Sequence, residues 1–360
     1  MPEQDIHVTA QMPGRTLQAD GKEYLFFSGT SYLGISCNLK FRELLQQGFS
    51  LYGTNYSSSR NSNLQLQVFE EAEAYLATFT GAEAAITMSS GYLAGQALMH
   101  SLQHAASIFL YAPDTHPALW RDLSDAPDNA LTYDEWVAKI LLEIPALPHQ
   151  DIILICNSLD PLKAQDHSFE WVKALPPNKS ITLVIDDSHG LGITGTNGAG
   201  IWSYLVTLKH LAHITPVVVG SLGKAFGIPA GVILGDKEVV SQVKKSPYFG
   251  GASPAIPAYL YTFLHSGSIL AEARQQLFAN ITYFLERLDH PEQLSYFNRY
   301  PVFYTLQHEL YPYLLQQNIM ISSFRYPTPA DAPITRLVLN SLHTTRDLDT
   351  LAEAVNAFKV

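Results

Sequence analysis

One lysine lies directly after a run of apolar residues, in the stretch VVVGSLGKAFG (217–227). Glycine and other small residues surround Lys224 and leave space for a bound group beside its amine. A lysine after a strand is most often exposed to solvent, but a partly desolvated amine can lose its proton and form a Schiff base with an aldehyde. Ser221, three residues earlier, could donate a hydrogen bond to a phosphate. We therefore interpret Lys224 as the attachment point of a carbonyl cofactor.

Two acids and a histidine follow another apolar run, in ITLVIDDSHGLG (181–192). A buried carboxylate is costly unless it is paired, so we expect Asp186 to face a cation such as a protonated pyridine nitrogen. Strand alternation predicts that Asp186 is the more enclosed acid and that Asp187 points elsewhere. His189, past the turn, could return to the same pocket. One alternative is a turn-capping aspartate beside an incidental histidine. The other is a hydrolase triad through Ser188, which lacks a nucleophile-elbow pattern.

Two further stretches follow apolar runs, MSSGYLAG (88–95) and YAPDTHPALW (111–120). Ser90 and Gly91 would open a helix whose free N–H groups and positive dipole end suit a phosphate. His116, in a loop before a proline, could stack on an aromatic ring. Taken separately, each stretch also has an ordinary structural explanation, a small-residue turn or a loop histidine.

Together the four stretches supply a phosphate cradle, a stacking imidazole, a carboxylate for a pyridinium and an amine for an aldehyde. Pyridoxal phosphate uses all four. In open α/β sheets, ligands bind beyond the carboxyl ends of the strands, and each stretch would lie at such an end. The sequence therefore predicts a pyridoxal 5'-phosphate site and no metal site.

The elements that would position these residues alternate along the chain. Short apolar runs separated by helical stretches predict an α/β fold with a mostly parallel sheet covered by helices on both faces. After Gly235 the pattern changes to helices, a strand and a closing helix, which predicts a smaller α+β domain. We expect an N-terminal arm packing with the small domain (1–38), a large cofactor-binding domain (39–245) and the small domain (246–360). The predicted strands of the sheet are AAITM, SIFLY, DIILIC, ITLVI, PVVVG and AGVILG.

Local signals support these elements. Asp20-Gly21 predicts the turn of an N-terminal hairpin. Apolar residues at helical spacing before Gly81 predict a helix that ends there. Thr344 and Asp347 predict a capping box at the start of the last helix.

Composition limits the partners. The 360 residues carry a net charge of −11, which argues against nucleic acid or an anionic membrane as a partner. Two cysteines, Cys37 and Cys156, cannot form a disulfide framework. The N-terminal stretch lacks the apolar core of a signal peptide, and no run is long enough to span a bilayer. We expect a soluble cytoplasmic protein.

The chain resembles the α-oxoamine synthases, pyridoxal-phosphate enzymes of the type I aminotransferase fold, and most of all the 8-amino-7-oxononanoate synthase branch. The resemblance runs from about Gly14 to the C-terminus in several blocks that occur in the family's order. GAEAAITMSSGYLAG, DDSHGLGITGTNGAG and GSLGKAFGIPAGVILG are similar to the family's SGY, DEAHG and SKAFG blocks. The other blocks are GRTLQADGKEYLFFSGTSYLGIS, YGTNYSSSRNSN and RLVLNSLHTTRDLDTLAEAV.

The resemblance implies a role for each matching residue. Lys224 would hold the cofactor, Asp186 would pair with its pyridine nitrogen, His189 would contact its hydroxyl and His116 would stack on its ring. The residues implied around the phosphate are Ser90, Gly91, Tyr92 and Ser221. Ser158 would lie beside the cofactor, Arg336 would bind the substrate carboxylate, and Ser31 would lie near the substrate.

The implied reaction is a decarboxylating condensation of an amino acid with an acyl-CoA (or an acyl carrier thioester), performed by a homodimer. Another pyridoxal-phosphate activity, such as transamination or aldol-type cleavage, and a degenerate partner subunit of an active paralogue are the alternatives. The chain departs from the family pattern at several positions. Ser31 replaces an asparagine, Gly223 replaces the serine before the lysine, and Gly250 and Gly251 replace a Ser-Thr pair.

Overall fold

The computed structural model describes residues 6–104, 106–127, 130–326 and 331–359. These divide into two compact units. The larger unit contains residues 43–159 and 166–267, and the smaller contains Met1–Arg42, Asp160–Gln165 and Ser268–Val360. The predicted arm clusters with the C-terminal part of the chain, apart from its first five residues, which lie outside the described residues. The whole segment 246–267, which we assigned to the small domain, clusters with the larger unit instead.

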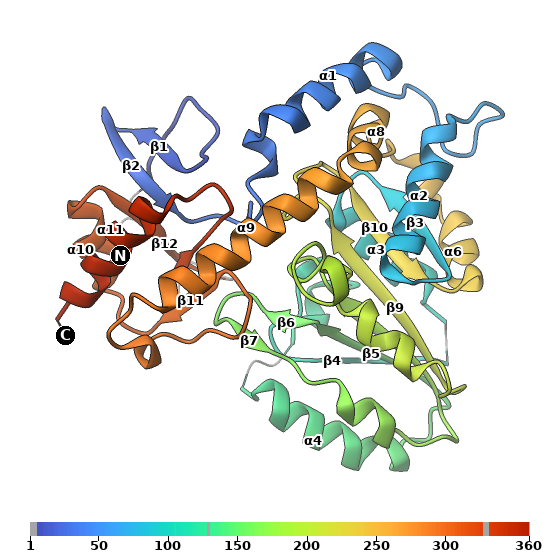
Figure 1. The fold of residues 1–360 in the computed structure, drawn as a ribbon. Coiled ribbons are helices and arrows are strands. Elements are labelled where there is room, and N and C mark those ends of the chain that lie inside the picture. The colour runs from blue at the N-terminus through green and yellow to red at the C-terminus, as the bar shows by residue number, and fades with distance from the viewer. Residues whose placement is uncertain (1–5, 105, 128–129, 327–330, 360) are drawn as a thin grey trace. The chain divides into compact units, whose positions relative to one another are not determined.

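A six-stranded sheet forms the centre of the larger unit, in the order β3-β10-β9-β8-β5-β4 (Figure 1). Its strands are β3 (Ala84–Met88), β4 (Ile108–Tyr111), β5 (Asp151–Asn157), β8 (Ser180–Asp186), β9 (Ile214–Ser221) and β10 (Gly231–Gly235). β4, β5, β8 and β9 are mutually parallel, whereas β10 is antiparallel to both of its neighbours. The six apolar runs predicted as strands and the mostly parallel sheet are therefore confirmed.

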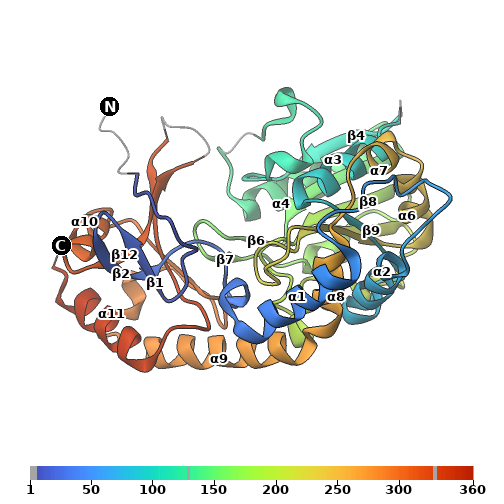
Figure 2. The same cartoon turned by 90° about the horizontal axis from the view of Figure 1, so that it is seen from above.

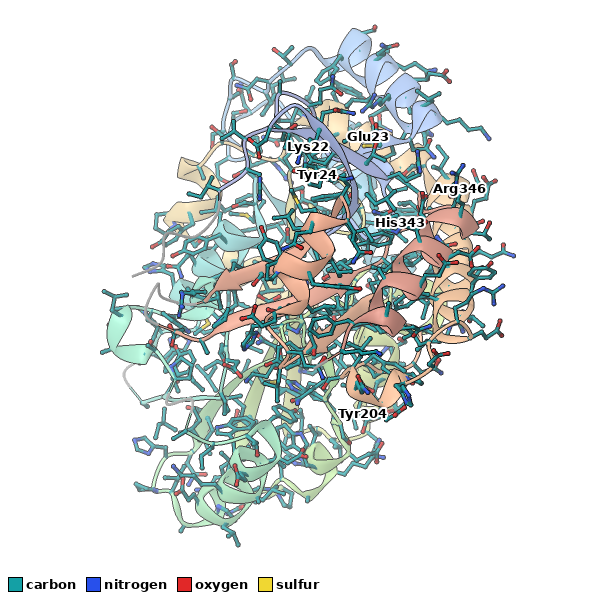
Figure 3. All side chains as sticks on the ribbon, turned by 90° about the vertical axis from the view of Figure 1, so that its left-hand side faces the viewer. Lys22, Glu23, Tyr24, Tyr204, His343 and Arg346 are labelled. Carbon is teal, nitrogen blue, oxygen red and sulfur yellow. The ribbon has the colours of Figure 1, made fainter. Side chains whose placement is uncertain are left out.

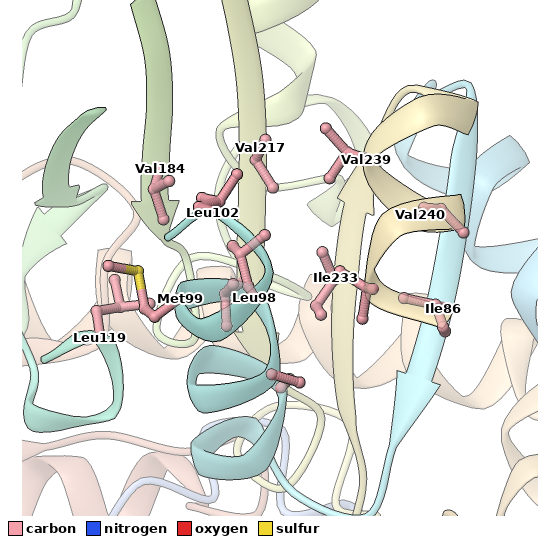
Figure 4. Close-up of a cluster of buried hydrophobic side chains, with 14 of the residues drawn as sticks. Ile86, Leu98, Met99, Leu102, Leu119, Val184, Val217, Ile233, Val239 and Val240 are labelled. Carbon is pink, nitrogen blue, oxygen red and sulfur yellow. The ribbon is translucent and has the colours of Figure 1, made fainter. Parts of the chain in front are cut away.

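Helices α3 (Gly91–Ser101) and α6 (Lys237–Lys244) cover one face of this sheet. Leu98 on α3, Leu102 directly after it and Val239 on α6 pack with Val217 and Ile233 of the sheet in one buried cluster (Figure 4). Burial of such side chains stabilises the fold by about 1.5–3 kcal/mol each. This packing fixes where α3 begins relative to the strand ends.

At the β3 edge, α2 (Gln67–Thr80) packs against β3 and α8 (Pro257–His265) (Figure 2). Gly81 ends α2 with φ of 84°, as its sequence position predicted. Gly48 in α1 (Leu39–Tyr52) lies so close to α8 that an added Cβ would be 2.6 Å from the Ala258 carbonyl oxygen. The remaining helices of the larger unit are α4 (Tyr133–Glu143), α5 (Trp202–Leu205) and α7 (Pro247–Gly251). Among the described residues, no helix is both long and apolar enough to cross a membrane.

The smaller unit contains a five-stranded sheet in the order β1-β2-β12-β13-β11. Its strands are β1 (Thr16–Ala19), β2 (Lys22–Phe27), β11 (Val302–Thr305), β12 (Ile319–Arg325) and β13 (Pro333–Val338). Asp20 and Gly21 connect β1 to β2 with φ of 52° and 74°, so the predicted hairpin turn is confirmed. The two-stranded pair β6 (Leu159–Asp160) and β7 (Gln165–Asp166) precedes β8 in the chain.

Three helices, α9 (Gly267–Leu285), α10 (Leu310–Gln316) and α11 (Thr345–Ala357), complete the chain. The predicted Thr344–Asp347 capping box at the start of α11 is confirmed. His343, just before it, contacts β2, where Figure 3 labels Lys22, Glu23 and Tyr24. Its ring stacks on Phe27 at 4.0 Å, and burial lowers the pKa of the imidazole to about 4.

Candidate cofactor site at the strand ends

The predicted site residues of the larger unit lie where the central strands end. In the sheet register Asp186, the last residue of β8, is opposite Asn157 of β5 and Val219 of β9. The Ser158 amide donates to the Asp186 carbonyl oxygen at 2.9 Å, which brings the end of β5 beside the end of β8. Ser221 is the last residue of β9. Parallel pairing therefore brings Ser158, Asp186 and Ser221 to the same edge of the sheet.

The N-terminus of α3 lies against this edge, as predicted. Ser90 caps the helix, and its hydroxyl accepts from the Leu93 amide at 3.1 Å. Within the described residues, the amides of Gly91 and Tyr92 have no acceptor, which is the arrangement that binds phosphate at a helix start. Tyr92 is 56% exposed, and its predicted place beside the phosphate stays a prediction.

Gly91 is required by its distance to Ser221. A Cβ at Gly91 would lie 2.8 Å from the Ser221 Cβ and 2.9 Å from its Cα. We expect Gly91→Ala to destabilise the fold by about 1–3 kcal/mol, since α3 must shift away from β9. Urea unfolding measures this change. Gly251→Ala is the control, because a Cβ there meets no atom within 4 Å. Equal unfolding free energies for the two variants would contradict the close packing of α3 on Ser221.

Lys224 lies in a tight turn between β9 and β10. The Leu222 amide donates to the Ala230 carbonyl at 2.8 Å, and the Ile228 amide donates back to the Leu222 carbonyl at 3.1 Å. These bonds fasten both ends of the turn to the sheet, and the Lys224 side chain within it is half-buried.

Electrostatics link three of the predicted residues. Desolvation lowers the pKa of His116, the Asp186 carboxylate raises it, and the Lys224 ammonium lowers it. The imidazole is exposed to solvent on one side, while its Nδ1 accepts from the Ala118 amide at 3.1 Å. Both charges therefore act on a ring whose orientation is fixed by its own backbone. The structure brings His116, Asp186 and Lys224 into one neighbourhood, and it places half-buried His189 three residues beyond Asp186.

The prediction that Asp186 is the more enclosed of the two acids is wrong. Asp187 is fully buried, whereas Asp186 is only half-buried. Strand alternation fails here because the chain turns directly after β8 and folds back over Asp187. A Cβ at Gly190 or Gly200 would collide with the Asp187 carboxylate oxygens, and the Ile201 amide donates to Oδ2 at 2.8 Å.

The pKa of Asp187 is raised to about 7, chiefly by burial. The Ser158 side chain lowers the pKa of Asp187, an effect smaller than that of burial. In the described part of the chain, however, the Ser158 hydroxyl makes no hydrogen bond of normal geometry. Between the ordinary carboxyl value of 3.8 and about 7, the folded protein binds a proton that the unfolded chain does not bind. The contribution of Asp187 to the free energy of unfolding therefore falls as pH rises through this window.

Asp187→Asn removes that titration. We expect the free energy of unfolding of the variant to fall less than that of the wild type as pH rises from about 4 to about 7. Urea unfolding at a series of pH values measures the difference. Parallel curves for the two proteins would show that the buried carboxyl does not titrate in this range.

Arg336 and Ser31 belong to the smaller unit. Arg336, on β13, is 4% exposed; its Nη1 donates to the Pro161 carbonyl, and its Nε has no hydrogen-bond partner among the residues that the structure describes. Its positive charge lowers the pKa of two buried tyrosines, Tyr32 and Tyr300, although burial raises both values by more. Tyr32 follows Ser31 directly, and the hydroxyls of the two tyrosines lie 3.3 Å apart. A buried guanidinium with an unused N–H group suits a carboxylate ligand. The role of Arg336 as a substrate contact stays a prediction.

Three of the positions that depart from the family pattern are glycines, and they differ in how much space a side chain would have there. A Cβ at Gly250 would collide with the Asn61 side chain, so the serine of the family pattern does not fit without a shift. At Gly251 the space is open. At Gly223 a Cβ would make ordinary contacts, at 3.4 Å from the Ser221 hydroxyl. Of these three positions, only Gly250 would need a neighbouring side chain, that of Asn61, to move for a larger residue to fit.

The residues of this edge fit pyridoxal phosphate. The Ser158 hydroxyl is buried and has no hydrogen-bond partner in the described part of the chain, and the two α3 amides are free to donate to an anion. The Asp186 carboxylate accepts from the Ser188 amide at 2.8 Å through Oδ1, and among the described residues no hydrogen bond to its other oxygen is seen. A buried hydroxyl, free amide donors and a carboxylate together suit a phosphorylated pyridine.

The aminotransferase class I and II family model matches residues 36–355, and the chain belongs to this family. The chain is 25% identical to the 8-amino-7-oxononanoate synthase of Aliivibrio fischeri, over 97% of this chain and 92% of that protein. It is 26% identical to the enzyme of that name from Janthinobacterium sp., over 94% and 90%.

Two solved structures share the fold. Serine palmitoyltransferase from S. paucimobilis, solved with bound PLP, superposes with a TM-score of 0.81 at 18% identity and covers 98% of this chain and 92% of its own. The 8-amino-7-oxononanoate synthase of Francisella tularensis has a TM-score of 0.70 at 22% identity, with coverages of 92% and 97%. The predicted fold class, a pyridoxal-phosphate-dependent transferase of type I, and the resemblance to α-oxoamine synthases are confirmed.

Proposed function

We propose that this chain is a pyridoxal-phosphate-dependent acyltransferase that condenses an amino acid with an acyl thioester, as 8-amino-7-oxononanoate synthase does. The observation that supports it most is the joint action of Asp186 and Lys224 on His116, beside the free amides of α3. The assignment of the condensation follows the names of the full-length relatives. We propose further that the protein works as a homodimer.

When bound, pyridoxal phosphate supplies an aldehyde for an amine and a ring that stores a pair of electrons. The amides of Gly91 and Tyr92 bind its phosphate. The Asp186 carboxylate would face the ring nitrogen, His116 would cover one ring face and His189 would contact the ring hydroxyl. These contacts orient the reacting atoms and exclude water from one side.

Arg336 holds the amino-acid carboxylate, and the Lys224 amine removes the Cα proton. A bond then forms between Cα and the acyl carbon while the carbon–sulfur bond of the thioester breaks and the thiol leaves. The bond from Cα to the carboxyl group breaks next and releases CO2. Lys224 returns a proton to Cα, because the same amine that acts as the base becomes the acid.

The test is to load the purified protein with pyridoxal phosphate and record its visible absorbance. Glycine, alanine and serine are then added one at a time, with and without acyl-CoA, while absorbance and thiol release are followed. Thiol release that needs both substrates is the expected result. Amino-acid turnover without thioester would replace the proposal with another pyridoxal-phosphate activity, and a loaded protein that turns over nothing would favour a partner subunit. A protein that remains colourless with added pyridoxal phosphate would overturn both enzyme activities and favour a partner subunit that binds little or no cofactor.

A further inference from the structure

The hydrogen-bond ladder between β8 and β9 ends irregularly at the candidate site. The Asp187 amide donates to the Val219 carbonyl at 2.8 Å, as a parallel ladder requires. The next regular bond would run from the Ser221 amide to the Asp187 carbonyl. That carbonyl instead accepts from the amides of Gly190 and Leu191, at 3.1 and 2.9 Å, in the turn after β8. The Ser221 amide has therefore lost its regular backbone acceptor.

The side chain of Ser188 takes the place of this acceptor. Its Oγ accepts from the Ser221 amide at 2.9 Å, and the residue is 5% exposed. The amide of the same residue donates to Asp186 Oδ1 at 2.8 Å. Ser188 thus connects the carboxylate at the end of β8 to the end of β9.

Ser221 in turn contacts the other parts of the site. It is opposite Gly231 of β10, its hydroxyl accepts from the Gly223 amide at 3.2 Å, and Gly91 of α3 packs against it. Lys224 follows three residues later in the same turn. A change in the position of the Ser221 amide would therefore move the phosphate cradle and the lysine together, relative to Asp186.

We propose that Ser188 is a positioning residue, which holds the Lys224 turn and the phosphate-facing end of β9 at a fixed distance from Asp186. This inference rests on the proposed cofactor function. The family pattern DEAHG has alanine at this position, and an alanine cannot accept a hydrogen bond. The serine is thus a feature of this chain that the family pattern does not assign.

The test compares Ser188→Ala with the wild type in two measurements, the dissociation constant for pyridoxal phosphate and the pH midpoint of the bound cofactor's visible absorbance. We expect about 5- to 100-fold weaker binding and a shifted midpoint, because the part-buried Ser221 amide loses its acceptor. Ser188→Thr keeps the hydroxyl and should restore both values. Ser188→Cys, of similar size but with a weak acceptor, provides the same comparison if the alanine variant does not fold.

Ser203→Ala is the matched control. Ser203 lies on α5, and in the wild type its hydroxyl donates to the Gly200 carbonyl at 2.6 Å and accepts from the Thr196 amide at 3.2 Å. Among the described residues, this hydroxyl makes no bond to β9. We expect its cofactor affinity to stay within about twofold of the wild type, with any loss confined to the free energy of unfolding. Unchanged affinity and midpoint in Ser188→Ala, or equal shifts in both variants, would overturn the positioning role. A wild type that binds no pyridoxal phosphate would overturn the proposed function and this inference with it.

Discussion

Lys224→Ala is expected to lower turnover by at least about 1000-fold, because the same amine captures the aldehyde and moves the Cα proton. The side chain is half-buried in a turn that backbone hydrogen bonds fasten to the sheet at both ends, and the substitution leaves these bonds in place, so we expect the fold to be largely kept. The measurements are kcat in the thiol-release assay and the visible absorbance of the protein with added pyridoxal phosphate.

Lys237→Ala is the control for the loss of one positive charge. Its side chain is 80% exposed and lies 3.7 Å from Glu83, a surface pair worth little. We expect its turnover and spectrum to match those of the wild type. Turnover retained by the Lys224 variant would remove this residue from the chemistry altogether.

Asp186→Asn is expected to lower kcat by about 100- to 1000-fold, the size of effect seen when one preorganised charge-stabilising group is removed. A neutral amide cannot keep a proton on the ring nitrogen, so the ring stores electrons less well. The amide oxygen can still accept from the Ser188 amide, so the turn after β8 should keep its shape. Steady-state kinetics should show the loss mainly in kcat, with a much smaller change in KM.

Asp236→Asn is the matched control for this variant. Asp236 caps α6 by accepting from the Val239 amide at 2.7 Å, and asparagine caps a helix about as well as aspartate. We expect wild-type kinetics. An Asp186 variant with wild-type kcat would show that no carboxylate is needed at the end of β8.

Features that depend on near neighbours in the chain could be predicted from the sequence. The runs AAITM and DIILIC are apolar throughout because both faces of their strands are covered, and their bounds agree with β3 and β5 to within one residue. Gly81 and the Thr344–Asp347 pair act through atoms at most four residues away. The resemblance then supplied the roles that spacing alone left open.

Features that depend on how the chain turns after a strand could not be predicted. Asp187 is enclosed because Gly190 and Gly200 fold over it from a loop whose path no periodicity reveals. The bond from the Ser221 amide to Ser188 depends on where one carbonyl turns away from the ladder. A serine among small residues gives no signal of such a bond.

The antiparallel strand β10 has a consequence for how the protein is made. β10 pairs with β3, more than one hundred residues earlier, and Gly231 packs so closely on Ser90 that no side chain would fit there. The start of α3 and the Lys224 turn therefore meet only after that distant pairing closes, a slow kind of step in folding. A chain still emerging from the ribosome cannot capture the cofactor until the residues after Gly235 have been synthesised.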